Sequence, residues 1–181
     1  MANSLTFTMG LDRASLQKFI QSATAKVEGA VRPAAQAGVQ VIYYQAKRNV
    51  QAIGKKTGNL ERSIYQAFSP EKSKSLTAVY HVSWNQKTAP HGRLVEYGHI
   101  QRYVSYVGSD GKWYTAKRKG VKGKKPSRKA SQAVKDAYYL TLKSPKFIPA
   151  KPFMRNAIAS HGKKALDAMA AEFAKRVGYV G

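Results

Sequence analysis

The sequence predicts an α+β fold in which a small antiparallel sheet packs against a long N-terminal helix and a long C-terminal helix, with a projecting β-hairpin and a basic loop. Apolar residues follow helical spacing over about residues 12–53 and again over about 152–177. Short strand-like runs lie between them. A chain of 181 residues holds one domain with a proper core more readily than two. We therefore expect residues 1–181 to form one domain, with residues 100–147 as a hairpin and basic-loop insertion.

The first half of the chain is dominated by one helical pattern. Leu5–Met9 alternates apolar and polar residues and predicts a short strand. Asp12 can then cap a helix that Gly54 closes. Pro33 falls midway and removes a backbone hydrogen bond, so we expect either one kinked helix or two helices meeting near Gly29–Pro33. Small residues gather around this point and predict close approach by a neighbouring helix or sheet: Ala30, Ala34, Ala35, Ala37 and Gly38.

The middle of the chain predicts short elements. Thr57 or Asn59 can cap a short helix, and Gly58 lets the chain turn into it. Two strands should follow, over residues 64–68 and 76–84, joined through a proline and a charged turn. A further short helix is expected over residues 93–97, closed by Gly98 in a left-handed conformation.

The second half predicts a hairpin, a loop and the final helix. Residues 103–107 and 112–116 flank a turn that contains Asp110-Gly111, which is a strong hairpin signal. Residues 117–130 read as a loop, and 132–142 as either helix or strand. Pro152 suits the first turn of the last helix. Its apolar positions, with Phe153 and Met154 directed to the core, form a stripe that Gly162 interrupts: Phe153, Ala157, Ile158, Ala165, Met169 and Phe173.

The charge of the chain is extreme. It has 32 Lys and Arg against 9 Asp and Glu, a formal net charge of +23. Such a balance indicates nucleic acid, an anionic membrane surface or an acidic protein as a partner, and says nothing about fold. The absence of cysteine excludes disulfides, thiolate metal sites and cysteine nucleophiles. Residues 1–10 lack the features of a secretory signal, and no run approaches the roughly 20 apolar residues that span a bilayer. We expect a soluble protein made in a cytoplasm, with no membrane partner.

The densest positive charge lies in the predicted loop, without any acidic residue. The residues are Lys117, Arg118, Lys119, Lys122, Lys124, Lys125, Arg128 and Lys129. They could contact double-stranded DNA through its phosphates, without sequence preference, and full engagement would give a log–log salt slope of about −7. A solvated surface loop, or a loop docked on an acidic neighbour, explains the same pattern.

Aromatic residues flank this loop: Tyr103, Tyr106, Trp113 and Tyr114. They could stack on unpaired bases. Alternating aromatics in a hairpin more often pack on a core or on a neighbouring subunit. If the hairpin projects, they become contacts for a protein partner.

The sequence contains no recognisable catalytic or cofactor site. His91, Glu96 and His99 do not have the spacing of a helical zinc motif. Glu96 is better interpreted as the ion-pair partner of Arg155 or Arg93. The glycines and lysines of residues 120–125 lack the spacing of a phosphate-binding loop. We therefore predict no enzymatic activity, no metal and no cofactor.

Three ordered motifs resemble one protein family. They are Thr-Gly-Asn-Leu-Glu-Arg-Ser-Ile at residues 57–64, Gly-Arg-Leu-Val-Glu-Tyr-Gly at 92–98, and Ile-Pro-Ala-Lys-Pro-Phe-Met-Arg at 148–155. Together, over roughly residues 35–175, they look like the gene-ten-product-like family of long-tailed phages, described as head–tail joining, tail-completion or neck proteins. Two departures are a long basic stretch over residues 100–147, which the family pattern does not specify, and Asn156, where many relatives have proline.

The resemblance implies a small α+β subunit that acts by position in the virion. Copies would assemble into a closed ring in the neck, six being one candidate number, with other neck and tail proteins as partners. The motif residues would then serve mainly to determine the fold: Thr57, Gly58, Leu60, Ile64, Glu96, Gly98, Pro152, Phe153 and Arg155. The alternative is a non-specific nucleic-acid-binding module that works through its basic loop.

Overall fold

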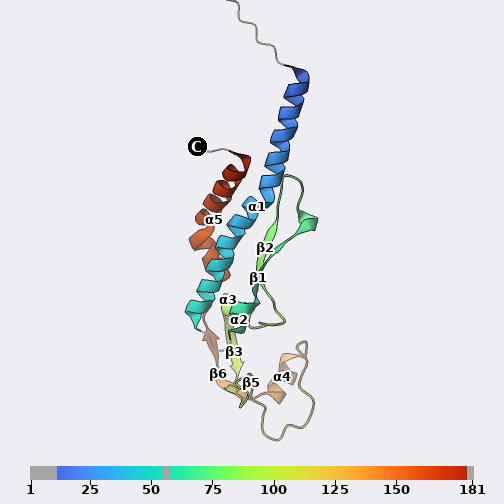
Figure 1. The fold of residues 1–181 in the computed structure, drawn as a ribbon. Helices are drawn as coiled ribbons and strands as arrows, with labels where there is room; N and C mark the ends of the chain where they lie inside the picture. Colours follow the sequence, from blue (N-terminus) through green and yellow to red (C-terminus); the bar gives the residue numbers. More distant parts are fainter. Residues whose placement is uncertain (1–11, 55–57, 179–181) are drawn as a thin grey trace, which may run out of the picture. The chain divides into compact units, whose positions relative to one another are not determined.

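The computed structural model describes residues 12–54 and 58–178 and confirms the α+β class. The chain divides into two compact units, residues 1–92 with 153–181 and residues 93–152. The first contains the long helices and one two-stranded sheet, and the second contains two further two-stranded sheets (Figure 1). The strand predicted over residues 5–9 lies outside the described residues. The expectation of one domain stays a prediction.

Helix α1 (Arg13–Ile53) is a single element that runs through Pro33. Its N-terminus is capped as predicted, because the Asp12 carboxylate accepts hydrogen bonds from the backbone N–H groups of Ala14 and Ser15 at 3.3 and 3.1 Å. Gly54 ends it with φ of 97°, the positive value expected of a glycine stop. The helix therefore continues through Pro33 as one element and is not divided into two helices near Gly29–Pro33.

Helix α5 (Met154–Val177) packs antiparallel along α1 (Figure 1). The Asn49 side-chain amide donates to the Phe153 carbonyl oxygen at 2.9 Å, and Gly38 faces Ala165 and Met169 farther along α5. Most buried residues of the two helices are small, which lets the two backbones approach: Ala30, Ala34, Gly38, Ala46, Ala157 and Ala165. The close approach predicted for the alanine- and glycine-rich part of α1 is confirmed, and the neighbour is α5.

Two predictions for α5 are corrected. Pro152 does not lie in its first turn, because Phe153 is the N-cap and the proline precedes it. Phe153 is fully buried, as predicted, with its ring 5.5 Å from that of Trp84. Ile158 was expected on the core stripe but is 59% exposed. The reason is helical geometry, since Ile158 follows the buried Ala157 and so lies about 100° around the helix from it.

The sheet of the first unit joins β1 (Ile64–Phe68) and β2 (Tyr80–Trp84) in antiparallel register, from Ile64 opposite Trp84 to Phe68 opposite Tyr80. Both strands contact α1. Strand β1 has the predicted bounds. Strand β2 begins at Tyr80 and not at residue 76, because the chain first forms the 3₁₀ turn η1 (Pro70–Lys72) and an isolated bridge between Lys74 and Thr77.

The short helix α2 (Asn59–Ser63) begins after Gly58, whose φ of 72° is left-handed. No side chain caps it, so Asn59 is its first residue and not its cap, while Thr57 lies outside the described residues. Leu60 and Ile64 are buried, as expected of residues that determine the fold.

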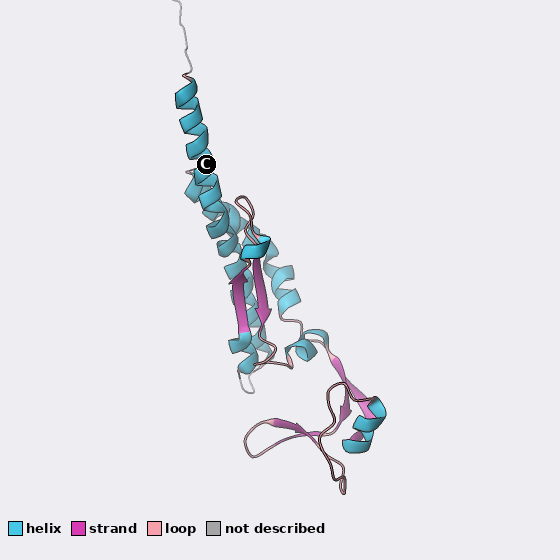
Figure 2. Cartoon of the chain, turned by 90° about the vertical axis from the view of Figure 1, so that its right-hand side faces the viewer, coloured by secondary structure: helices cyan, strands magenta, loops and turns pink. Residues whose placement is uncertain are grey.

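In the second unit, β3 (His99–Tyr103) pairs antiparallel with β6 (Thr141–Ile148), and β4 (Ser105–Val107) pairs with β5 (Trp113–Thr115) (Figure 2). The hairpin is confirmed in shorter form, and Tyr103 lies at the end of β3. Helix α3 (Gly92–Tyr97) matches its prediction. Helix α4 (Gln132–Tyr138) resolves the ambiguity of residues 132–142.

Candidate interaction surfaces

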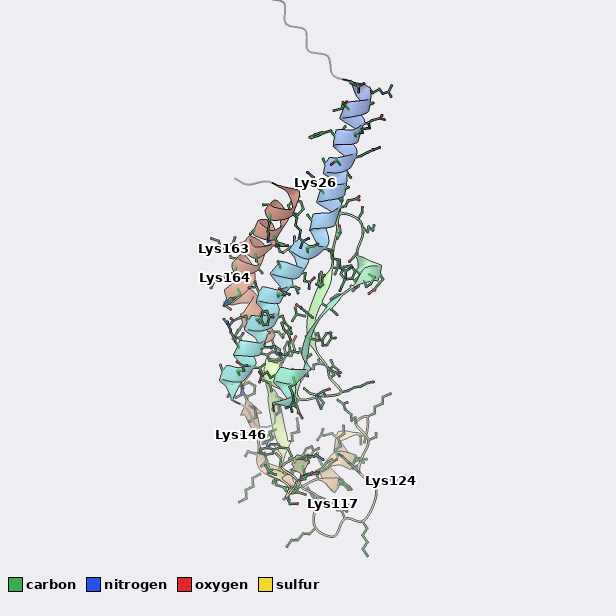
Figure 3. All side chains as sticks on the ribbon, in the orientation of Figure 1. Lys26, Lys117, Lys124, Lys146, Lys163 and Lys164 are labelled. Atoms are coloured by element: carbon green, nitrogen blue, oxygen red, sulfur yellow. The ribbon has the colours of Figure 1, made fainter. Side chains whose placement is uncertain are left out.

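The basic loop, residues 117–130, leaves all eight of its predicted cations exposed. It contains no helix or strand, apart from a bridge between Lys117 and Tyr139. Figure 3 labels Lys117 and Lys124 within it. These side chains therefore lie exposed on one loop of the second unit. Their contact with DNA or with another partner stays a prediction.

The two ends of the basic loop are attached to the segment around α4. Arg118 donates from its backbone N–H to the Tyr138 carbonyl and from Nε to the Tyr139 carbonyl, both at 3.1 Å. The Lys117 ammonium lies 5.3 Å from the Tyr138 ring centroid, within cation–π range. At the other end, Lys135 Nζ donates to the Arg128 carbonyl at 2.9 Å. The loop therefore leaves and returns at defined points.

Between these attachments the cations have no carboxylate partner among the residues that the structure describes. Residues 93–152 contain 15 Lys and Arg but only three acidic residues, a net charge of +12. Glu96 is 1% exposed, Asp110 lies 3.4 Å from Lys112, and Asp136 accepts hydrogen bonds within the unit. The positive charge of the unit is thus largely uncompensated, which favours a polyanionic or acidic partner.

Asp136 connects α4 to β3. Its carboxylate accepts from the Tyr103 hydroxyl and from the Gln132 amide, each at 2.7 Å. The bond from Tyr103, followed by that from Gln132, lowers the pKa of Asp136 below its ordinary value. Partial burial, followed by the hydrogen bond to Asp136, raises the pKa of Tyr103. These bonds hold the helix that anchors the basic loop.

The predicted aromatic group separates into two places. Tyr106, Trp113 and Tyr114 are all exposed on the hairpin, with the Tyr106 and Tyr114 rings 5.9 Å apart. Tyr103 instead packs beside Tyr139, at 5.2 Å between ring centroids. The hydrogen bond from the Tyr114 hydroxyl to Asp110, at 2.7 Å, raises the pKa of Tyr114. The three exposed rings could contact a protein surface or unpaired bases.

The motif around Glu96 has a defined backbone geometry. Gly98 has φ of 73°, and a β-carbon there would lie 2.8 Å from the Ala150 nitrogen and the Ile148 carbonyl oxygen. Lys151 donates its backbone N–H to the Val95 carbonyl at 2.8 Å. Glycine is therefore required at position 98 for both its conformation and its size. The pairing of Glu96 with Arg155 or Arg93 stays a prediction.

Sequence reasoning missed strands β3 and β6 and the apolar pair that they expose. Ile100 lies opposite Phe147, and both side chains are more than half exposed. The apolar residues at the end of 141–148 indicate a strand, but Pro145 within the same run argues against one. Proline removes a ladder donor, but an edge strand tolerates it, and both strands of a two-stranded sheet are edges.

No group of three or more potential metal-ligating side chains occurs within residues 12–54 and 58–178. In the same part of the chain, no helix has the length and apolar character needed to cross a bilayer.

Comparison with family models finds one family to which part of the chain is similar. Residues 14–98 match the family model described as "Bacteriophage HK97-gp10, putative tail-component". The matched range contains the motifs at residues 57–64 and 92–98, and the motif at 148–155 lies beyond it. The predicted family resemblance is confirmed. Comparison with curated proteins and with solved structures gives no match.

Proposed function

We propose, from the resemblance of residues 14–98 to this phage tail-component family, that the chain is a non-enzymatic structural subunit of the virion neck. In this role it completes the tail and joins it to the DNA-filled head as a ring of subunits. The family match is the observation that carries the proposal, and it supports a structural tail protein. The ring and the position in the neck are further parts of the proposal, beyond a structural tail protein.

Exposed apolar residues support a role in assembly. Large side chains lie in solvent on both units, the most exposed being Phe19 at 71% and Phe147 at 68%. Single exposed apolar residues are ordinary, but several along one element are typical of surfaces that a partner covers. A ring requires two different surfaces of each subunit to meet on adjacent copies.

Light scattering of the purified chain, alone and with purified tails, tests this function. We expect a ring-sized species, formed alone or on tails, whose mass does not depend on added DNA. Tails that lack the chain should fail to join filled heads and should recover joining when it is added. A chain that remains monomeric with tails and does not restore joining would contradict the proposal.

A second candidate function is non-specific binding of double-stranded DNA by the second unit. The observation that favours it is the +12 charge of residues 93–152, concentrated on an anchored loop. Lysines that contact phosphates release counterions, so each contact contributes about −0.9 to the log–log salt slope of duplex binding.

Two matched lysine pairs test this contact. Lys124 and Lys125 lie on the basic loop, whereas Lys163 and Lys164 lie on α5, and all four side chains are exposed. Figure 3 labels Lys124, Lys163 and Lys164. Replacing the loop pair with glutamine should weaken binding and reduce the magnitude of the salt slope by about 2. Replacing the α5 pair should leave the slope unchanged. Equal losses from both pairs would show that net charge, and not this loop, determines the affinity.

A further inference from the structure

The hairpin formed by β4 and β5 carries two tyrosine rings on one face. Tyr106 lies opposite Tyr114 in the antiparallel register, so both side chains are on the same face of the hairpin. Their ring centroids are 5.9 Å apart, with 32° between the ring planes. Both residues are exposed. Neither ring therefore belongs to a core, and both have surface available to a ligand.

Contacts within the turn hold the second of these rings in place. The Tyr114 hydroxyl donates to the Asp110 carboxylate at 2.7 Å, and Lys112 lies 3.4 Å from the same carboxylate. A β-carbon added to Gly108 would lie 2.8 Å from the Tyr114 ring, so the ring packs closely on the backbone of the turn. A side chain that is already held in one orientation loses little conformational entropy when a ligand stacks on it.

The basic loop begins beside this ring pair. Lys117 follows Tyr114 by three residues, so their Cα atoms are at most about 11 Å apart. Between them, Ala116 is held at both of its backbone groups. Its N–H donates to the Val104 carbonyl at 2.8 Å, and its carbonyl accepts from the Leu140 N–H at 2.9 Å. The first cation of the loop is therefore kept close to the rings.

The loop supplies positive charge without a competing carboxylate. Its eight cations are all exposed, and residues 117–130 contain no acidic residue. Cations that follow a nucleic-acid backbone, next to aromatic rings on which bases stack, are the combination typical of proteins that bind single-stranded nucleic acid. The hairpin and the loop together provide both parts.

The rings favour an unpaired strand over a duplex. Within a duplex, each base is stacked on its neighbours and presents only its edges to a protein. Unpaired bases can turn outward and stack on aromatic side chains. The cations of the loop can contact the phosphates of either form, but the rings add affinity only where bases are unpaired.

The size of the ring face favours nucleic acid over an acidic protein. A stable protein interface covers about 800 Å² on each partner. Val104 and Ala116, which flank the ring pair along the hairpin, are only partly exposed and add little to such an area. One base, in contrast, needs only one ring face and gains about 1–3 kcal/mol from stacking on it.

We propose that the β4–β5 hairpin and the basic loop together bind single-stranded nucleic acid without sequence preference. Tyr106 and Tyr114 stack on unpaired bases, and the cations of the basic loop contact the phosphates. The inference goes beyond the proposed neck function and does not depend on ring formation. It also differs from the duplex contact considered above, which needs only the cations.

Three labelled probes test the class of ligand: an oligothymidylate of about 12 nucleotides, an abasic strand with the same number of phosphates, and a duplex of the same length. Fluorescence anisotropy should give the highest affinity for oligothymidylate. Because the duplex has the higher charge density, this preference cannot come from charge alone. Equal affinity for oligothymidylate and the abasic strand would overturn the inference, since only phosphates would be contacted. Tighter binding of the duplex would overturn it in favour of the duplex contact.

Variants of the ring face test the residues. Tyr106→Leu should weaken oligothymidylate binding about 5- to 150-fold, which corresponds to the 1–3 kcal/mol of one stacked base. The salt slope should stay unchanged, because a ring releases no counterions. Tyr106→Phe keeps the ring and should retain the affinity. If Tyr106→Phe binds as weakly as Tyr106→Leu, stacking by this ring is contradicted.

Tyr65→Leu is the matched control. Tyr65 is also an exposed strand residue, 45% exposed against 52% for Tyr106, but it lies on β1 of the first unit. This variant should bind oligothymidylate as the unchanged chain does. Equal losses from Tyr65→Leu and Tyr106→Leu would overturn the assignment to the hairpin.

Two further measurements test the phosphate contacts and the competing partner. Replacing Lys124 and Lys125 with glutamine should reduce the magnitude of the salt slope for oligothymidylate by about 1.4. An unchanged slope would overturn the part given to the basic loop. Poly-glutamate serves as an acidic polypeptide probe. If its binding depends on Tyr106 while oligothymidylate binding does not, the rings contact an acidic protein and the inference is overturned.

Discussion

Gly38 of α1 lies directly against Met169 of α5. A β-carbon at position 38 would overlap the Met169 side chain and lie 2.9 Å from the Ala165 carbonyl oxygen. The neighbouring buried residues of α1, Ala34 and Ala46, are also small. The stability of the first unit therefore depends on how closely the backbones of its two long helices approach, and only small side chains permit that distance.

The two glycines within α1 should respond oppositely to alanine. Gly29→Ala should stabilise the protein by about 0.5–1 kcal/mol, because alanine favours the helix and the site is open. Gly38→Ala should instead destabilise it, since overpacking costs about 1–3 kcal/mol. The free energies of unfolding in denaturant would show the difference. Equal stabilisation by both substitutions would mean that the helices separate at little cost.

Gly98 and Gly111 form a second matched pair, with φ of 73° and 72°. Alanine at either position should incur the cost of a left-handed backbone, about 1–2 kcal/mol. Gly98→Ala should cost more, because its β-carbon would meet the chain at Ile148 and Ala150, whereas Gly111 is open. Thermal melts of the two variants would measure this. If Gly111→Ala lowers the melting temperature as much as Gly98→Ala, the steric argument is contradicted.

Removing the buried carboxylate of Glu96 should impair folding and assembly together. Its side chain is 1% exposed, and such a group is retained only with polar interactions that offset its desolvation. Glu96→Ala should lower the free energy of unfolding by a few kcal/mol and reduce assembly. Glu96→Gln keeps the shape of the side chain and should lower the free energy of unfolding by less. Unchanged melting with normal assembly in the alanine variant would exclude a structural role.

The link between α4 and β3 should weaken in acid and in strong alkali. The pKa of Asp136 is lowered from 3.8. Its contribution to the stability of this link is therefore complete above about pH 3.8 and is lost as the pH falls through the lower folded-state pKa. The pKa of Tyr103 is raised from 10.0, so its contribution is complete below about pH 10 and is lost as the pH rises through the higher folded-state pKa.

The NMR signals of the Tyr103 ring and the α4 amides would report both transitions. Asp136→Asn retains an acceptor for Tyr103 but does not titrate, so it should lose the acid transition. An identical acid transition in that variant would assign the effect to another carboxylate.

Elements with local signals could be predicted from the sequence. Asp12 and Gly54 mark the ends of α1 because a cap and a stop depend on residues within a few positions of each other. Strand β1, helix α3, the hairpin and the left-handed Gly98 were predicted for the same reason. The family resemblance also came from short ordered motifs, two of them within the matched residues 14–98.

Two of the errors fell where the outcome depends on distant residues. The pairing of β3 with β6 joins residues 38 to 49 positions apart, and Pro145 concealed the second strand. Ile158 has the spacing of a core residue, but its exposure depends on where α1 lies against α5.

The sequence by itself thus determined the long helices, the ends of α1, the charge and the family resemblance. The tertiary structure decided which faces those helices bury, that α1 extends beyond α5, and that Ile158 and Leu166 remain in solvent. Burial is a property of two surfaces in contact, and periodicity describes only one of them.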